Sequence, residues 1–192
     1  FARDHVVVCG TDEVIALIRQ CAFHPETIEI HSLRDGEEVD EWETVMTIEG
    51  DYADFAHLET IYLGILARQS RIATNVRRVV KAANGKPVLF FPARYDIYQT
   101  QESDGYAALV GGIHGFSTDA NALAAGGEGL GTIPHALIAS YKGDTVAATE
   151  AFDKYVDPSI ARIALVDFDN DCVNTSLAVA RKLGKKLAGV RL

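Results

Sequence analysis

Four apolar, strand-like runs in this sequence each end in a side chain suited to binding a phosphate, a ribose or a carboxylate. These side chains are Arg94, His135, the pair Asp167 and Asp169, and Arg191. In α/β folds, ligands bind outside the carboxyl ends of the strands. We therefore expect the four strand ends to surround one hollow that accepts a phosphorylated sugar.

Arg94 follows the apolar run 87–91 and the residue Pro92. A guanidinium in that place can grip a phosphate or carboxylate through two parallel hydrogen bonds. The alternative is a surface arginine in a strand-to-helix loop, and spacing does not decide between the two.

A second polar cluster joins a glycine pair to two hydroxyls. Gly111 and Gly112 precede Ser117, Thr118 and a helix that we expect to begin near Asp119. Backbone N–H groups at a helix N-terminus bind anions, and hydroxyls add to such a site. Glycine pairs also occur in plain turns, so this signal by itself is weak.

His135 follows the short run Gly131-Thr132-Ile133-Pro134. A single histidine is more often a hydrogen-bonded structural residue than a nucleophile, so its type alone does not assign a role. Ser117, His135 and Asp167 have the side chains of a hydrolase triad. However, Ser117 lacks the Gly-x-Ser-x-Gly turn, which disfavours that reading.

The acidic segment 167–171 allows three interpretations. A calcium loop requires glycine at its sixth position, where Cys172 stands, so that interpretation fails. The aspartyl nucleophile of haloacid-dehalogenase phosphatases also follows a strand, but that fold needs far more sheet downstream. The third interpretation assigns Asp167 and Asp169 to ribose hydroxyls or to a magnesium ion carried by a phosphorylated substrate.

The composition limits the class of partner. The formal charge of −9 disfavours nucleic acid and anionic membranes, and no apolar run reaches the length of a membrane span. The three cysteines indicate neither a disulfide framework nor a zinc site, and we expect a cytoplasmic protein. Five basic residues lie at helical spacing, which favours a solvated helix face or an anion site: Arg68, Arg71, Arg77, Arg78 and Lys81.

The expected elements fall into two regions. Residues 1–86 predict an N-terminal α/β domain that contains a strand at 6–9, a helix at 12–21 capped by Thr11, an antiparallel pair at 27–33 and 43–48, and helices at 55–67 and 74–83. Residues 87–192 predict part of a β/α barrel, because strand-like and helical runs alternate there. The strands are expected at 88–91, 107–110, 131–133, 162–166 and 187–191, and the helices at 119–126, 144–155 and 172–183.

Taken together, these residues resemble the type II phosphoribosyltransferases, and within them the nicotinate phosphoribosyltransferase family. The resemblance spans nearly the whole chain, and the order and spacing of its motifs are more specific than any one of them. The matching segments are Leu58-Glu59-Thr60, Arg71-Ile72-Ala73-Thr74, Phe91-Pro92-Ala93-Arg94, Gly111-Gly112, Ser117-Thr118, 131–135, 166–169 and 190–192.

The resemblance implies an enzyme of NAD biosynthesis that joins nicotinate to phosphoribosyl pyrophosphate (PRPP), giving nicotinate mononucleotide and pyrophosphate. ATP would assist through a phosphohistidine at His135, and Mg²⁺ would accompany the phosphorylated substrate. A homodimer with shared active sites is implied as well. The resemblance further implies that Phe91 stacks on the pyridine ring, that Thr118 faces the substrate pocket, that Arg94 and Arg191 hold the carboxylate or phosphates, and that Asp167 and Asp169 face the ribose and magnesium.

Two alternatives stay open, a quinolinate phosphoribosyltransferase and a non-catalytic relative that binds a nucleotide. The quinolinate family carries arginine directly after the glutamate, where this chain has Thr60, and lysine after the loop arginine, where it has Tyr95. One substrate carboxylate is therefore favoured over two. The chain resembles a form truncated at both ends, so we expect the isolated 192-residue polypeptide to be inactive.

Overall fold

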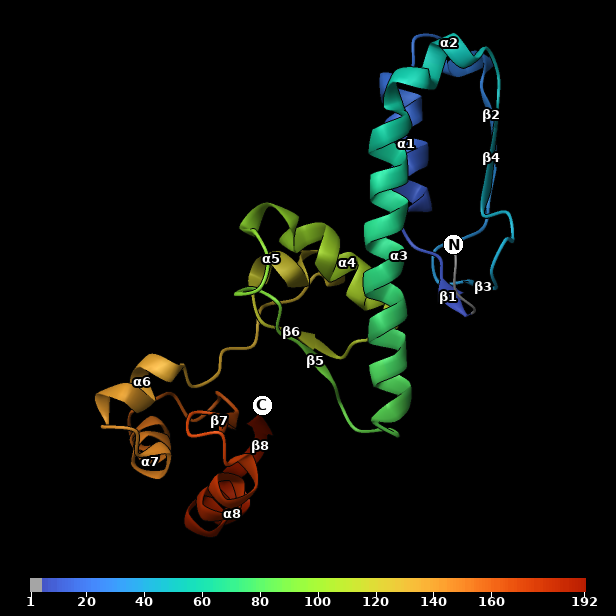
Figure 1. The fold of residues 1–192 in the computed structure, drawn as a ribbon. Helices are drawn as coiled ribbons and strands as arrows, with labels where there is room; N and C mark the ends of the chain where they lie inside the picture. Colours follow the sequence, from blue (N-terminus) through green and yellow to red (C-terminus); the bar gives the residue numbers. More distant parts are fainter. Residues whose placement is uncertain (1–4) are drawn as a thin grey trace. The chain divides into compact units, whose positions relative to one another are not determined.

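The computed structural model describes residues 5–192, which form two compact units, residues 5–130 and 131–192. The first unit contains a long helix, shorter helices and three two-stranded sheets (Figure 1). The predicted domain boundary at residue 86 falls inside this unit and stays a prediction. The elements of the first unit are β1 (Val6–Val7), α1 (Thr11–Cys21), η1 (Pro25–Thr27), β2 (Glu29–Ser32), β3 (Glu38–Val39), β4 (Met46–Glu49), α2 (Tyr52–Phe55), η2 (Ala56–Leu58), α3 (Glu59–Ala82), β5 (Leu89–Phe90), η3 (Tyr98–Thr100), α4 (Gln101–Gly111), β6 (Gly115–Phe116), α5 (Asp119–Ala122) and η4 (Leu123–Ala125).

The second unit contains one parallel pair of strands and three α-helices. Its elements are α6 (His135–Ser140), α7 (Thr145–Tyr155), β7 (Arg162–Leu165), α8 (Cys172–Leu183), η5 (Gly184–Lys186) and β8 (Leu187–Arg191). The helices predicted at 144–155 and 172–183 are confirmed as α7 and α8.

Helix α3 contributes side chains to three hydrophobic clusters of the first unit. Its buried Leu66 packs with Val14 and Ile18 of α1 and with Phe55, and β2 and β4 contribute half-buried side chains to the same core. The two helices predicted at 55–67 and 74–83 are one continuous helix, so their separation was wrong. No glycine or proline interrupts residues 65–82, so nothing there ends the helix.

The antiparallel pair is confirmed, because β2 pairs with β4 in the register Ile30 with Ile48. The prediction that Thr11 caps the first helix was wrong. The helix begins at Thr11 itself, and Gly10 occupies the cap position with a positive φ of 100°. The Thr11 hydroxyl instead donates to Asp35 Oδ1 at 2.8 Å.

The strand predicted at 107–110 was wrong, because these residues lie within α4. Ala107, Ala108 and Gly111 are buried while Leu109 is exposed, which is a helical pattern of burial. A short apolar run is compatible with a strand or with a buried helix face, and periodicity alone does not separate them. Helix α4 therefore connects β5 to β6, which pair in parallel.

Residues 131–133, also predicted as a strand, form no strand in the structure. Pro134 has no N–H to donate to a ladder, which disfavours strand pairing at this point. The segment is still fixed, because Ile133 is fully buried against Ile138, Ala148 and Leu165.

The parallel pairs β5–β6 and β7–β8, each connected through a helix, confirm the predicted α/β class. No helix within residues 5–192 is both long and apolar enough to cross a membrane.

Candidate functional site

The carboxyl edge of β7 and β8 brings several predicted site residues together. Leu165 and Arg191 are partners in the parallel ladder, and Val166 N donates to Arg191 O at 3.0 Å. Asp167 thus follows β7 at the edge where Arg191 ends β8. Arg191 Nη1 donates to Thr132 Oγ1 at 2.7 Å, which places the segment that leads to His135 at the same edge.

His135 and Asp167 form the central contact of this edge. His135 Nε2 lies 3.1 Å from Asp167 Oδ1, and the His135 ring lies beside Phe168 with 6.4 Å between ring centroids. Asp167 Oδ1 is buried and makes no hydrogen bond of good geometry, although the distance to His135 qualifies as an ion pair.

Asp169 lies in the loop before α8. Its carboxylate accepts from the Thr175 hydroxyl, with both oxygens at 3.3 Å, and from Asp171 N at 3.2 Å. Asp171 caps α8, because its carboxylate accepts from Asn174 N. The side chains of Asp169 and Asp171 therefore stabilise the loop, and these contacts set the direction of the Asp169 carboxylate.

A magnesium ion carried by a substrate would fit these carboxylates. Within residues 5–192, no group of three His, Cys, Asp or Glu side chains is arranged to hold a metal ion. Magnesium bound to phosphates needs only one or two protein carboxylates and keeps its waters. The buried, poorly satisfied oxygen of Asp167, with Asp169 two residues away, meets that requirement.

The carboxyl edge of β5 and β6 positions the other predicted residues in the first unit. Phe90 pairs with Phe116, and Ser117 N donates to Phe90 O at 3.0 Å, so Phe91 and Thr118 both follow strand ends at this edge. Arg94 is exposed in the turn beyond Phe91. These three residues lie in one unit, and His135, Asp167, Asp169 and Arg191 lie in the other. A common hollow for the two groups stays a prediction.

Thr118 is tied into the protein by its neighbours. Its hydroxyl caps α5 by accepting from Asn121 N at 3.2 Å, and it donates to Gln101 Oε1 at 2.7 Å. The Asn121 amide donates to Gln101 O at 2.7 Å, and Asn121 is fully buried. The Thr118 side chain is therefore held rigidly, whatever ligand it faces.

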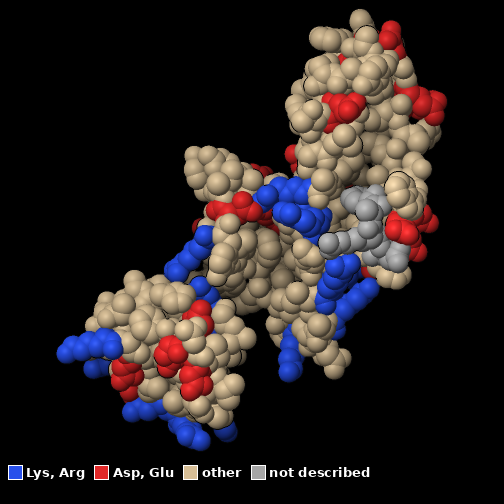
Figure 2. Space-filling view, in the orientation of Figure 1, with Lys and Arg blue, Asp and Glu red and all other residues tan. Residues whose placement is uncertain are grey.

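The predicted basic stripe lies on α3, where acidic partners engage much of it. Arg77 Nη1 and Lys81 Nζ contact Glu38 Oε1 at 3.1 and 3.3 Å, and Arg68 pairs with Asp96 and Asp104. Figure 2 shows the basic side chains gathered over the region that α3 occupies. The Arg68 and Arg77 side chains, 30% and 28% exposed, are therefore partly buried against carboxylates, whereas the Lys81 side chain is 64% exposed.

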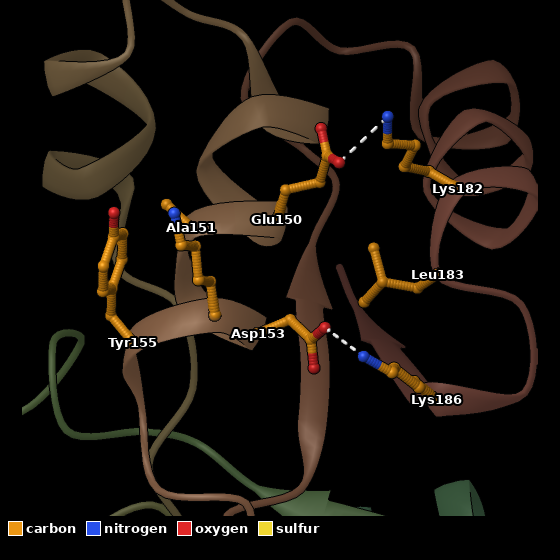
Figure 3. Close-up of a pocket in the computed structure, with 8 residues that line it drawn as sticks. Glu150, Ala151, Asp153, Tyr155, Lys182, Leu183 and Lys186 are labelled. Atoms are coloured by element: carbon orange, nitrogen blue, oxygen red, sulfur yellow. Dashed lines mark hydrogen bonds and ion pairs between the residues drawn. The ribbon is translucent and has the colours of Figure 1, made fainter.

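A hollow of about 520 Å³ lies between α7 and α8, away from the strand ends (Figure 3). Lys182 contacts Glu150 at 2.9 Å and Lys186 contacts Asp153 at 2.8 Å across it. Lys186, and then Arg162, hold the pKa of Asp153 below its usual value. Because both lysines already pair with carboxylates, these ion pairs hold α7 against α8 and the segment after it, and the hollow is poorly suited to binding a phosphate.

Cys9 is excluded as a nucleophile. It is fully buried, and burial raises the pKa of its thiol to about 12, so it stays protonated at neutral pH.

Comparisons with known proteins place this arrangement in a family. The model described as quinolinate phosphoribosyl transferase, N-terminal domain, matches residues 1–70. A nicotinate phosphoribosyltransferase from Bacillus subtilis (strain 168) is 29% identical over 175 residues, covering 84% of this chain and 34% of the relative. The crystal structure of a nicotinate-nucleotide pyrophosphorylase from Pyrococcus furiosus is 37% identical with a TM-score of 0.82, covering 99% of this chain and 47% of that one.

These matches support the type II phosphoribosyltransferase family. The crystal structure of human nicotinic acid phosphoribosyltransferase shares the fold, with a TM-score of 0.63 at 15% identity over 99% of this chain and 54% of that one. This chain spans about a third of the length of the Bacillus subtilis relative and about half of the Pyrococcus furiosus chain.

Sequence reasoning missed several residues of this chain that position the candidate site. Thr132 holds Arg191, Gln101 and Asn121 hold Thr118, and Thr175 holds Asp169. Thr132 stands in the matched motif 131–135, which was a usable signal. Gln101 is 17 residues from its partner Thr118, and nothing in the local sequence indicates that contact.

Proposed function

We propose that the protein to which this chain belongs is a nicotinate phosphoribosyltransferase, which joins nicotinate to PRPP and releases pyrophosphate in NAD biosynthesis. The observation that supports it best is the meeting of His135, Asp167 and Arg191 at the carboxyl edge of β7 and β8. An imidazole, a carboxylate and a guanidinium thus lie together at the edge of the sheet where α/β folds bind phosphorylated ligands.

The proposed chemistry depends on charge and position. The sugar carbon of PRPP gains positive charge as pyrophosphate departs, so the reaction needs carboxylates near the ribose and cations near the leaving group. In this proposal Asp167 and Asp169 face the ribose, and Arg191 neutralises phosphate oxygens. Bound magnesium would add positive charge to the pyrophosphate. Phe91 stacks on the pyridine ring and Arg94 holds its carboxylate, which fixes the attacking nitrogen.

ATP assistance is part of the proposal and is assigned to His135. Its side chain is 40% exposed, so ATP can approach it, while Nε2 lies beside Asp167. A carboxylate next to one imidazole nitrogen orients the ring and stabilises positive charge on it, which favours attack by the ring on the γ-phosphate. Transfer would form a bond from a ring nitrogen to phosphorus and release ADP.

Quinolinate phosphoribosyltransferase is the second candidate, and the matched N-terminal family model and the 37% identical Pyrococcus furiosus structure favour it. Against it stand Thr60 and Tyr95, at positions where the quinolinate family is expected to carry basic residues. Both are exposed, and neither can neutralise a second carboxylate. A non-catalytic relative that binds a nucleotide is the third reading.

A homodimer and a cytoplasmic location complete the proposal. Ile61 and Leu63 on α3 are each about half exposed, at 51% and 53%, which is consistent with apolar contact to another copy. Mass measurement in solution tests the dimer. A monomer at micromolar concentration would contradict it.

Turnover and labelling of the full-length protein test the function. With PRPP and Mg²⁺ we expect nicotinate to be consumed and quinolinate to be left unchanged. With γ-labelled ATP we expect acid-labile label on the protein, absent from His135→Ala and retained by His31→Ala, an exposed histidine on β2. Consumption of quinolinate alone would favour the second candidate, and no turnover of either would favour the non-catalytic reading.

A further inference from the structure

Three large apolar or aromatic side chains that follow Arg94 in its loop are exposed. Tyr95, Ile97 and Tyr98 are 91%, 61% and 76% exposed. Within the loop, Tyr95 N donates to Pro92 O at 2.8 Å, a contact that shapes a turn but does not attach it to another element. Polar contacts therefore contribute to holding this part of the loop on the protein.

Arg68 of α3 supplies those contacts. Its Nε and Nη2 donate to the two carboxylate oxygens of Asp104, both at 2.8 Å, and Nη2 also reaches Thr100 Oγ1 at 3.3 Å and the carboxylate of Asp96. Thr100 donates to Asp104 Oδ2 at 2.9 Å, closing the cluster. One guanidinium thus joins α3, α4 and the loop.

Burial explains why this cluster is rigid. The Asp104 side chain is only 3% exposed and the Arg68 side chain 30%, so the pair is shielded from water and salt. The planar guanidinium binds a carboxylate through two parallel bonds, which fixes its orientation as well as its distance. Arg68 lowers the pKa of Asp96, so this link stays ionised at neutral pH.

We propose that Arg68 is a positioning residue for substrate binding, because its link to Asp96 ties the Arg94 loop to α3 and α4. This inference rests on the proposed function, which assigns the substrate carboxylate to Arg94. Arg68 itself is committed to two acids and a hydroxyl, so it acts through the loop and does not contact the substrate.

The test weakens only the contact between Arg68 and Asp96 and leaves the contact between Arg68 and Asp104 in place. Replacing Arg68 would leave the buried Asp104 without its charged partner and would risk unfolding. Asp96→Asn removes the charge of a 40% exposed side chain and keeps an acceptor oxygen for Ile97 N, now 3.1 Å away. Asp12→Asn, an equal change of charge on the exposed start of α1, is the matched control.

Two measurements on the full-length protein follow. Trypsin cleavage after Arg94, identified by mass, should be faster in Asp96→Asn than in the wild type or in Asp12→Asn. The KM for nicotinate should rise up to about fivefold with kcat unchanged, as expected for an exposed ion pair. In an Arg94→Gln background, Asp96→Asn should raise KM no further.

The possible failures are distinct. Unchanged cleavage, or an equal rise of KM in both backgrounds, would overturn the positioning role of Arg68. A KM raised by Arg94→Gln but unaffected by Asp96→Asn would overturn it as well. If Arg94→Gln leaves KM unchanged, the assignment of Arg94 to the substrate fails, and the positioning role in binding fails with it.

Discussion

Replacing Gly105 by alanine would push α4 and α5 apart. A Cβ at this position would lie 2.0 Å from Asn121 O and 2.7 Å from both Asn121 C and Cα. These are backbone atoms of a fully buried residue, so they cannot move aside as the end of a flexible side chain would. Overpacking of this kind costs about 1–3 kcal/mol, and a contact this short favours the upper end.

Gly64→Ala is the matched comparison, because the change is chemically the same. Gly64 is exposed within α3, and a Cβ there meets nothing within 4 Å. Alanine in a helix interior is more favourable than glycine by about 0.5–1 kcal/mol. The two variants should therefore move the unfolding free energy in opposite directions and differ by roughly 1.5–4 kcal/mol.

Urea unfolding of the purified protein measures both changes, provided that the slope against denaturant is the same in each variant. Gly105→Ala should lower the midpoint and Gly64→Ala should raise it. Equal midpoints for Gly105→Ala and the wild type would refute the reasoning, because they would mean that α4 and α5 do not approach as closely as described.

Two further predictions concern charge. The hydrogen bond from His24 to Asp54, at 2.8 Å, raises the pKa of His24, so its stabilisation is complete below the ordinary histidine pKa of about 6.5 and is lost as pH rises through the higher folded value. Unfolding free energies from pH 5 to 9 should show that loss in the wild type and not in His24→Gln, and the same slope in both would contradict it. Arg162→Met should lower the free energy of unfolding, measured by calorimetry, by about 3–5 kcal/mol. The Arg162 side chain is 7% exposed, pairs with Asp153, and donates hydrogen bonds to backbone carbonyls at and just after the end of α7. The exposed Arg181→Met should change little, and equal effects would refute the burial argument.

Local signals explain which elements were predictable. Asp144 and Asp171 cap α7 and α8 by accepting N–H bonds three residues on, and such caps are visible in the sequence. The run 107–110 carries no comparable signal, because its burial is set by contact with Val76 of α3 and with Ala122. Tertiary packing therefore decided what the local sequence left open.

In the candidate site, too, some residues could be predicted from the sequence and others could not. Side chains suited to phosphate and ribose could be identified because they follow apolar runs, as Asp167 does. The residues that hold them could not, because Thr132 and Arg191 are 59 positions apart, and Arg68 and Asp104 are 36 apart. One sequence shows residue types and spacing along the chain, whereas these contacts depend on which elements fold together.

A crystal structure of the full-length protein with nicotinate mononucleotide tests the central claim most directly. We predict that the pyridine ring lies on Phe91 with its carboxylate at Arg94, and that the ribose and phosphate lie among Asp167, Asp169 and Arg191. A nucleotide bound elsewhere, or these side chains on separate faces with no shared cavity, would contradict the account.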